Sequence, residues 1–196
     1  MWDQRYSVDE YVYGTAPNDF LRQQADSLRP GSALCLADGE GRNGVYLAEL
    51  GHAVTSVDLS TVAMAKAAAL ADQRGVTLST HVADLAAFDL GEARWDLVVS
   101  IFAHTPPTIR RDVHRRVTHA LRPGGTLVLE AYTPDQIGRG TGGPPVAEMT
   151  MTLQGLIDEL EGLDIVHGVE LVRPVVEGAG HTGDGAVVQV VAVKPS

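Results

Sequence analysis

The sequence predicts a doubly wound α/β fold, with a mostly parallel sheet, helices on both faces and a C-terminal antiparallel hairpin. Two observations predict it. Apolar runs of strand length alternate with segments of helix length through the first two thirds of the chain, which is typical of parallel sheets. The last two β-rich runs, 164–176 and 186–193, are separated by only nine residues. Such a connection allows an antiparallel pair but no parallel crossover.

The other elements follow from apolar periodicity and from turn residues at the boundaries. Strands are expected at 32–36, 53–57, 77–82, 96–101 and 126–132. Helices are expected at 18–28, at 42–50, from Ser60 to just before Gly75, from Pro106-Pro107 to Leu121 and at 152–162. Residues 134–145 are rich in Gly and Pro, and we expect a flexible segment there.

Bulk composition narrows the class of protein. The length of 196 residues fits one domain with its own core. The net charge of −10 disfavours sequence-independent binding to nucleic acid, which requires clustered Lys and Arg. The single cysteine, Cys35, excludes an intrachain disulfide, and no apolar run approaches the roughly 18 residues of a membrane span. The polar N-terminus lacks the apolar core of a signal peptide, so we expect a cytoplasmic protein.

A Gly-rich turn between the strand 32–36 and the helix 42–50 is the most informative segment. It reads Ala37-Asp38-Gly39-Glu40-Gly41-Arg42-Asn43-Gly44. Glycines remove Cβ atoms where a ligand approaches, and N–H groups at the start of a helix bind polar or anionic groups. Asp58 closes the second strand 19 residues after Gly39, near the spacing at which a Rossmann-like fold places a carboxylate on ribose hydroxyls. The sequence therefore predicts a nucleoside-containing ligand.

The resemblance to a known family rests on this turn and on several further motifs. Ligands of open α/β sheets bind outside the carboxyl ends of the strands, which gathers the turn, Asp58, Asp84 and the segment Ser100–His104 around one crevice. With the later turn Leu121-Arg122-Pro123-Gly124-Gly125, the chain resembles the class I S-adenosylmethionine (SAM)-dependent methyltransferases over about residues 30–196.

Motifs at both ends narrow the resemblance to one branch. They are Trp2-Asp3-Gln4-Arg5-Tyr6, Tyr13-Gly14, Pro17-Asn18-Asp19-Phe20-Leu21, Gly39-Glu40-Gly41-Arg42-Asn43, and Glu177-Gly178 with His181 and Gly183. Together they resemble the branch that includes tellurite-resistance and thiopurine methyltransferase-like proteins.

The resemblance implies a set of residues that bind SAM. They are Ala37, Asp38, Gly39, Glu40, Gly41, Arg42, Asn43, Asp58, Leu59, Asp84, Leu85 and Ser100. In this assignment Asp58 accepts hydrogen bonds from the ribose hydroxyls, Asp84 accepts one from the adenine amino group, and Arg42 meets the carboxylate. Leu59 and Leu85 lie beside the adenine. The residues alone leave open that Asp58 only caps the following helix and that Asp84 only forms a turn.

The turn departs from the family pattern at two positions. Cys35 stands where the family has an acid, and Ala37 stands where it has a first glycine. The acid commonly helps to hold the cationic amino group of SAM, so Asp38 or Glu40 is expected to replace it. Cys35, on a buried strand, is expected to be a small apolar filler.

The acceptor side is less defined, because methyl transfer from a sulfonium requires mainly alignment and exclusion of water. His104 directly follows the fourth strand and is the candidate catalytic residue; a loop cap is the alternative. His181, Tyr11 and Tyr13 are candidate substrate or lid residues, for which a plain turn or core packing stays open. The resemblance implies that residues 1–29 form a lid over the cofactor within a single domain, 1–196.

We therefore predict a SAM-dependent methyltransferase that acts on a small-molecule acceptor and releases S-adenosylhomocysteine (SAH). Two alternatives stay open. An NAD(P)-dependent oxidoreductase is one, because Gly39–Gly44 matches G-x-G-x-x-G. A non-catalytic SAM-binding protein is the other, because Cys35 replaces the usual acid. No metal site is expected, since the histidines show no metal-ligand spacing. Neither nucleic acid nor a membrane is an expected partner, and the sequence leaves a homodimer open.

Overall fold

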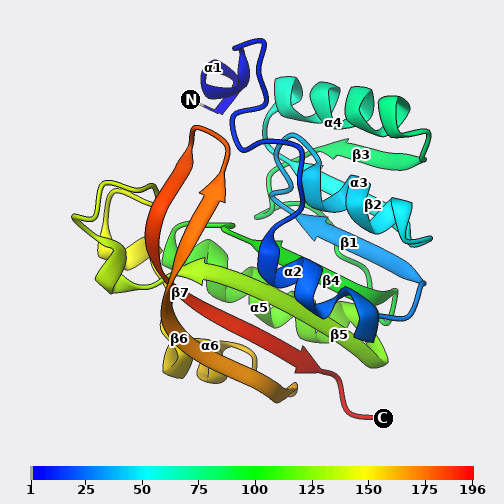
Figure 1. The fold of residues 1–196 in the computed structure, drawn as a ribbon. Coiled ribbons are helices and arrows are strands. Elements are labelled where there is room, and N and C mark those ends of the chain that lie inside the picture. The colour runs from blue at the N-terminus through cyan, green and yellow to red at the C-terminus, as the bar shows by residue number, and fades with distance from the viewer. Residues whose placement is uncertain (1) are drawn as a thin grey trace.

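The computed structural model describes residues 2–196 and confirms the predicted α/β fold. Its single seven-stranded sheet has the order β3-β2-β1-β4-β5-β7-β6 (Figure 1). The strands are β1 (Ser32–Leu36), β2 (Ala53–Asp58), β3 (Leu78–Val82), β4 (Trp95–Ile101), β5 (Leu121–Tyr132), β6 (Asp164–Glu177) and β7 (His181–Val193). Strands β1 to β5 pair in parallel, whereas β7 pairs antiparallel with both β5 and β6.

Helices cover both faces of the sheet (Figure 1). They are α1 (Trp2–Tyr6), α2 (Asp19–Gln24), α3 (Arg42–Glu49), α4 (Thr61–Arg74), α5 (Pro107–Ala120) and α6 (Leu153–Glu159). Short 3-10 turns lie at Ala25–Ser27, Pro134–Gln136 and Ala147–Met149. No helix among residues 2–196 is both long enough and apolar enough to cross a membrane.

The two faces are built from alternate residues of each strand, because successive side chains of a strand point to opposite sides. In β1, Leu34 and Leu36 belong to the core cluster that includes Val117 of α5. Cys35 between them belongs to the cluster on the other face, with Phe20 of α2. The free thiol is fully buried, and burial raises its pKa well above the ordinary value. Cys35 is thus the apolar filler that its strand position predicts.

The C-terminal hairpin is longer than the sequence pattern indicates. The predicted connection 177–185 is mostly strand, because Glu177 pairs with His181 and the turn is confined to residues 178–180. Gly185 lies inside β7, where a Cβ would come within 2.8 Å of the Val175 side chain. The glycine therefore marks a close approach between neighbouring chains and not a loop. This extension brings the hairpin tip to the upper edge of the sheet (Figure 1).

Strand β5 also begins earlier than predicted. The segment Arg122–Gly125 was expected to be a turn, but it continues the strand from Leu121. Gly124 N donates to Lys194 O and Lys194 N donates to Gly125 O, so the residue that follows β7 extends the pairing. The pattern Arg-Pro-Gly-Gly indicates a turn locally, and tertiary pairing overrides that preference.

Candidate active site

Three loops meet at the carboxyl edge of the parallel strands, where β1 lies between β2 and β4. The strand order reverses there, and ligands of open α/β sheets bind at such a switch point. Asp38 N donates to Val57 O, which joins the loop after β1 to the end of β2. Phe102 N donates to Glu130 O, which joins the loop after β4 to β5. Hydrogen bonds therefore join the loops that the sequence predicts to gather at this edge.

The Gly-rich turn adopts left-handed backbone angles at three positions. The φ values are 48° at Ala37, 58° at Gly39 and 84° at Gly41. At Gly41 a side chain would also collide with α4, since a Cβ would lie 2.6 Å from the Ala67 Cβ. Helix α3 begins immediately afterwards, at Arg42. The turn thus aims the N–H groups of a helix start at the crevice.

The two acids of the turn are engaged by the protein itself. Asp38 Oδ2 accepts from Ser56 Oγ at 2.6 Å and from Gly44 N at 3.2 Å. Burial raises the pKa of this carboxyl to about 7. Glu40 Oε2 accepts from Val12 N at 2.7 Å, and its Oε1 pairs with Lys66 Nζ at 2.9 Å. Both oxygens of Glu40 are thus engaged, whereas both hydrogen bonds to Asp38 go to Oδ2. That Asp38 replaces the acid missing at Cys35 stays a prediction.

Asp58 bridges the Gly-rich turn and the start of α4. Its Oδ2 accepts from Gly39 N at 3.0 Å, and its Oδ1 accepts from Ser60 N at 2.9 Å. Burial raises the pKa of this carboxyl. The cap of α4 is Ser60, whose side chain accepts from Ala63 N, and Asp58 holds the N–H of this cap residue. The position of Asp58 beside Gly39 suits the ribose assignment, which stays a prediction. The following Leu59 is 56% exposed, which leaves an apolar side chain free at this end of the crevice.

A segment that we call the N-terminal strap, residues 7–18, crosses the turn. Figure 1 shows it descending from α1 to α2, between α4 and the tip of the β6–β7 hairpin. Val12 donates its N–H to Glu40, and its carbonyl accepts from Gly180 N of the tip. Asn18 N donates to Asn43 Oδ1 at 2.9 Å. The strap thus ties the hairpin to the Gly-rich turn, and it lies within residues 1–29, for which a lid is predicted.

Helix α1 covers the turn from above. A Cβ on Gly39 would lie 2.9 Å from Tyr6 Oη, and Tyr6 is buried. Burial and the nearby Asp58 carboxylate raise the pKa of this phenol, so it stays neutral at physiological pH. Asp3 fixes the helix by accepting from Ser60 Oγ. Tyr6 was not among the predicted site residues, although it belongs to a quoted motif.

An aromatic cluster forms on the other side of the crevice, from segments far apart in the sequence. Its members are Tyr13, Phe102, His104, Tyr132 and His181. The ring centroids of Phe102 and Tyr132 are 4.5 Å apart, and that of His181 lies 4.8 Å from Phe102. Tyr13 of the strap approaches His181 to 4.6 Å. Of these, Phe102 lies in the segment Ser100–His104 that the sequence places at this edge, although it was not singled out as a site residue; its φ is left-handed, at 53°.

His104 is held on both sides of its ring. Nδ1 is 2.8 Å from Met149 O, and Nε2 accepts from Tyr132 N at 3.2 Å. Because a carbonyl only accepts and an N–H only donates, the ring must be neutral, with its proton on Nδ1. Burial lowers its pKa to about 4. This geometry fits the loop cap and not the predicted proton-transfer role.

Glu177 lies between the turn and the cluster. Its Oε2 accepts from Arg42 Nη2 at 2.6 Å, and its Oε1 accepts from Asn18 Nδ2 at 2.8 Å. Burial alone would raise the pKa of Glu177, but His181 and Arg42 lower it to about 2. Glu177 belongs to one of the motifs that carry the family resemblance, but the sequence predicts no role for it in the site.

Three buried polar atoms around the crevice have no hydrogen-bond partner within residues 2–196: Arg42 Nη1, Tyr132 Oη and His181 Nδ1. Buried polar atoms are rarely left unpaired, so each such atom points to a missing partner. The first belongs to the start of α3, and the other two belong to the aromatic cluster. The unpaired atoms are therefore a cationic donor beside the Gly-rich turn, and a phenol oxygen and an imidazole nitrogen in the aromatic cluster.

Residues 33–125 of the chain match the family model of a methyltransferase domain. A comparison with the curated proteins found no match.

Solved structures of other proteins share the fold of this chain. One comes from work on the conversion of a disulfide bond into a thioacetal group during echinomycin biosynthesis; it is 23% identical with a TM-score of 0.81, over 99% of this chain and 90% of that one. TehB from Haemophilus influenzae is 20% identical with a TM-score of 0.73, over 89% of this chain and 61% of that one. The N-methyltransferase NodS from Bradyrhizobium japonicum, in complex with SAH, is 18% identical with a TM-score of 0.71, over 100% and 97%.

The residues around the Gly-rich turn fit SAM at one decisive point. Arg42 Nη1 is a buried, unpaired cationic donor at the start of the helix that follows the Gly-rich turn. A carboxylate is the partner that such a guanidinium lacks, and SAM carries one on its amino-acid end. Gly39, with its left-handed φ, carries no Cβ, and Tyr6 Oη packs in the space that a Cβ would need. The site thus suits the amino-acid end of SAM.

Two of the predicted adenine contacts lie differently from expectation. Leu85 is 8% exposed and packs in the core cluster of α5, so its side chain does not line the crevice. Asp84 is exposed, and its Oδ1 accepts from Ala86 N, as a turn former does.

Two other predicted site residues also have their places in the fold. Tyr11 Oη donates to Lys66 O on α4 and not into the crevice. Ser100 is buried at the end of β4, where its backbone pairs with Leu36.

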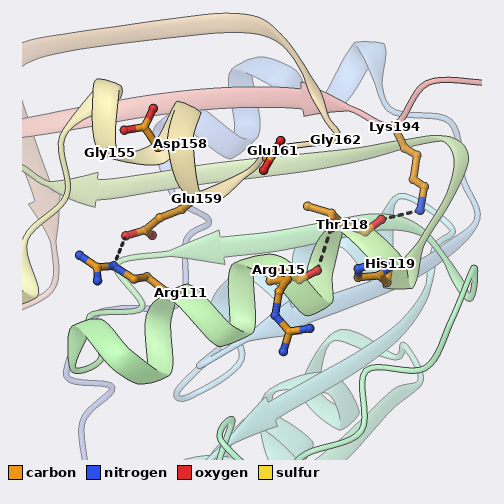
Figure 2. Close-up of a pocket in the computed structure, with 10 residues that line it drawn as sticks. All are labelled: Arg111, Arg115, Thr118, His119, Gly155, Asp158, Glu159, Glu161, Gly162 and Lys194. Carbon is orange, nitrogen blue, oxygen red and sulfur yellow. Dashed lines mark hydrogen bonds and ion pairs between the residues drawn. The ribbon is translucent and has the colours of Figure 1, made fainter.

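A groove of about 740 Å³ lies elsewhere, between α5 and α6 (Figure 2). Lys194, at its end, pairs with the start of β5, so the groove opens at the opposite edge of the sheet. Arg111 of one wall already pairs with Glu159 of the other at 3.6 Å. Within residues 2–196, no group of three or more His, Cys, Asp or Glu is placed to hold a metal ion.

Proposed function

We propose that this protein transfers a methyl group from SAM to a small-molecule acceptor. The observation that carries the proposal is the methyltransferase-domain match over residues 33–125, the segment that contains the Gly-rich turn, Asp58, Asp84 and Ser100. The backbone from Ala37 to Gly41 would hold the amino-acid end of SAM, and Asp58 would hold the ribose.

Bound SAM supplies an activated methyl group on a sulfonium. The chain's own residues then have to bind, orient and exclude water. Arg42 Nη1 would fix the carboxylate end, because it is buried and unpaired. The strap and α1 would close the turn from solvent, with Tyr6 against Gly39. In-line transfer would follow from alignment, so a dedicated base is needed only for an acceptor that is protonated at working pH.

The aromatic cluster is the proposed acceptor site. Tyr132 Oη and His181 Nδ1 are its two unpaired polar atoms. Burial, followed by the charge of Glu177, raises the pKa of Tyr132, so this phenol would orient an acceptor as a neutral group. His181 replaces His104 as the candidate for proton transfer, because both nitrogens of His104 are engaged.

The size of the acceptor is limited by glycine backbone around the cluster. A Cβ on Gly142 would lie 2.7 Å from His181 Cδ2, and one on Gly143 would lie 3.1 Å from the Tyr132 ring. Gly180 packs directly on the ring of Tyr13. The rings are thus closely enclosed, which favours a small acceptor over a polymer.

The setting of the reaction follows from bulk properties. A net charge of −10 favours a small substrate over nucleic acid. We place the reaction in the cytoplasm, since the single cysteine is a buried free thiol. Residues 1–196 would act as one domain, with 1–29 as its lid.

Calorimetric titration with SAM, SAH and NAD in parallel tests the proposal. We expect micromolar binding of SAM and SAH and no binding of NAD. Binding of NAD alone would contradict the proposal and restore the oxidoreductase alternative. Tight SAM binding without SAH release across a panel of small thiols, amines and heterocycles would favour the non-catalytic alternative.

A further inference from the structure

A single carboxylate oxygen lies between the two halves of the crevice. Glu177 Oε2 is 2.6 Å from Arg42 Nη2 and 3.6 Å from His181 Nδ1. The first contact is a short ion pair, whereas the second is just beyond hydrogen-bond length. Arg42 and His181 each carry an unpaired buried nitrogen. One oxygen therefore faces two groups that both need a further partner.

The surroundings hold Glu177 in place. Asn18 Nδ2 donates to its Oε1 at 2.8 Å and to Glu130 Oε2 at 2.6 Å. Arg173 pairs with Glu130 at 2.6 Å and approaches Glu177 to 3.5 Å. Two arginines thus balance two glutamates in a buried network. A change of charge at one member is felt by the others, because buried charges are weakly screened.

His181 is surrounded by groups that set its protonation. Tyr13 of the strap, Tyr132 of β5 and His104 after β4 face it, together with Glu177 of β6. His104 is neutral, and burial raises the pKa of Tyr132. Glu177 is therefore the anionic group in direct reach of the His181 ring. Its ion pair with Arg42 competes with its interaction with His181.

We propose that Glu177 couples the two halves, so that an anion on Arg42 Nη1 draws His181 Nδ1–H onto Glu177 and leaves Nε2 free for the acceptor. This inference rests on the proposed function. A carboxylate on Arg42 neutralises part of the guanidinium charge, and Glu177 then acts more strongly on His181. Coupling is reciprocal, so protonation of His181 changes the affinity for the anion by the same factor. Glu177 is thus a positioning residue that acts through its neighbours.

Nitrogen-15 NMR of the histidine rings tests the coupling on the wild-type protein, with SAH as the probe. His181→Gln identifies the His181 signals. We expect saturating SAH to shift His181 to the Nδ1–H form and to raise its titration midpoint by about one unit. An unchanged His181 titration in protein that calorimetry shows to be saturated would overturn the coupling and leave the proposed function standing. Absence of SAH binding would overturn both.

Two variants separate coupling from support of the fold. Arg42→Lys keeps the charge but cannot bridge two carboxylates with one planar group, so we expect weaker SAH binding, by at least about tenfold, without a response of His181. Glu177→Gln should also abolish the response. A full response of His181 in folded Arg42→Lys would overturn the proposal.

Glu159→Gln is the matched control. Glu159 also lies between an arginine and a histidine, with Arg110 Nη2 at 2.8 Å and His114 Nδ1 at 2.7 Å, but it lies on α6, away from the crevice. This variant should change the titration of His114 and leave both SAH affinity and the response of His181 as in the wild type. If SAH no longer changed the titration of His181 in this control, the loss would come from a general destabilisation of the protein. Such a result would overturn the proposed coupling.

Discussion

The two halves of the crevice share one edge of the sheet but use their polar atoms in opposite ways. After β1 and β2, the carboxylates of Asp38, Glu40 and Asp58 all accept hydrogen bonds from the chain itself. After β4 and β5, Tyr132 and the neighbouring His181 keep buried atoms without partners within residues 2–196. The carboxylates of the cofactor half are thus fixed before any ligand arrives, and Arg42 Nη1 is left there for the cofactor. The acceptor half, in contrast, is completed by its ligand.

The difference has an energetic consequence. A buried polar atom without a partner costs on the order of 1–3 kcal/mol, so the acceptor half lowers the stability of the free protein. The closed hydrogen bonds of the cofactor half contribute stability instead. Substitutions should therefore separate cleanly: those in the first half reduce both folding and cofactor binding, and those in the second half reduce turnover alone.

The largest expected effect is that of Asp58→Ala. This change removes the acceptor of Gly39 N and Ser60 N and the proposed partner of the ribose. We expect the affinity for SAH to fall by about 10- to 150-fold, since charge-assisted hydrogen bonds contribute roughly 1.5–3 kcal/mol. Calorimetry measures the affinity, and urea unfolding should show a parallel loss of stability.

Asp84→Ala is the control for an acid at the same edge. Asp84 is exposed and accepts from Ala86 N, so its loss should weaken SAH binding less than tenfold, in keeping with modest exposed hydrogen bonds. Unchanged SAH affinity in folded Asp58→Ala would contradict the ribose assignment.

The same contrast explains which parts of the site the sequence predicts. The cofactor half is contiguous: Ala37 to Asn43 and, 19 residues after Gly39, Asp58. A local motif can therefore be recognised. The aromatic cluster joins residue 13 to residues 102, 132 and 181. No spacing in the sequence predicts that meeting, because register and hairpin length decide it.

Similar reasons separate the predicted from the unpredicted elements of the fold. The strands β1 and β4 are largely apolar runs buried on both faces, and the bounds of β1 to β4 agree with prediction to within one residue. The tip of the β6–β7 hairpin is Gly-rich and was expected to be a loop. Most of the expected loop, 177–185, pairs as strand, and the turn at 178–180 packs against the distant strap, with Gly178 against the backbone of Val12 and Gly14. Composition does not indicate this contact.

Tyr132→Phe should have an intermediate effect and tests the acceptor half. It removes only the unpaired Oη and keeps the ring that stacks on Phe102 at 4.5 Å. We expect the free energy of unfolding to stay the same or to rise by up to about 1 kcal/mol, because a buried unsatisfied atom is removed. Turnover should fall about tenfold, while SAH affinity stays unchanged, if one hydrogen bond to the acceptor is lost.

Urea unfolding, calorimetry and steady-state rates on the same variant check these outcomes together. Tyr46→Phe on α3, outside the cluster, is the matched control and should leave turnover unchanged. A clear loss of stability in Tyr132→Phe would contradict the contrast, since it would mean that Oη has a partner within the protein.

His104→Gln should have the smallest effect, visible only through its pH dependence. The folded pKa of His104 is lowered by burial from 6.5 to about 4. Between these two pH values His104 binds a proton in the unfolded chain but not in the folded protein. The free energy of unfolding therefore falls as the pH falls through this range, and it levels off below about 4. Gln keeps a donor for Met149 O and does not titrate. Between pH 7 and pH 4.5, the free energy of unfolding should therefore fall by about 1–2 kcal/mol less in the variant than in the wild type. This difference is smaller than the pKa shift alone gives, because the ring is partly exposed. Urea unfolding at both pH values measures the difference. Equal acid sensitivity of the two proteins would show that His104 is protonated in the folded state, and would return it to the list of groups able to exchange a proton with the acceptor.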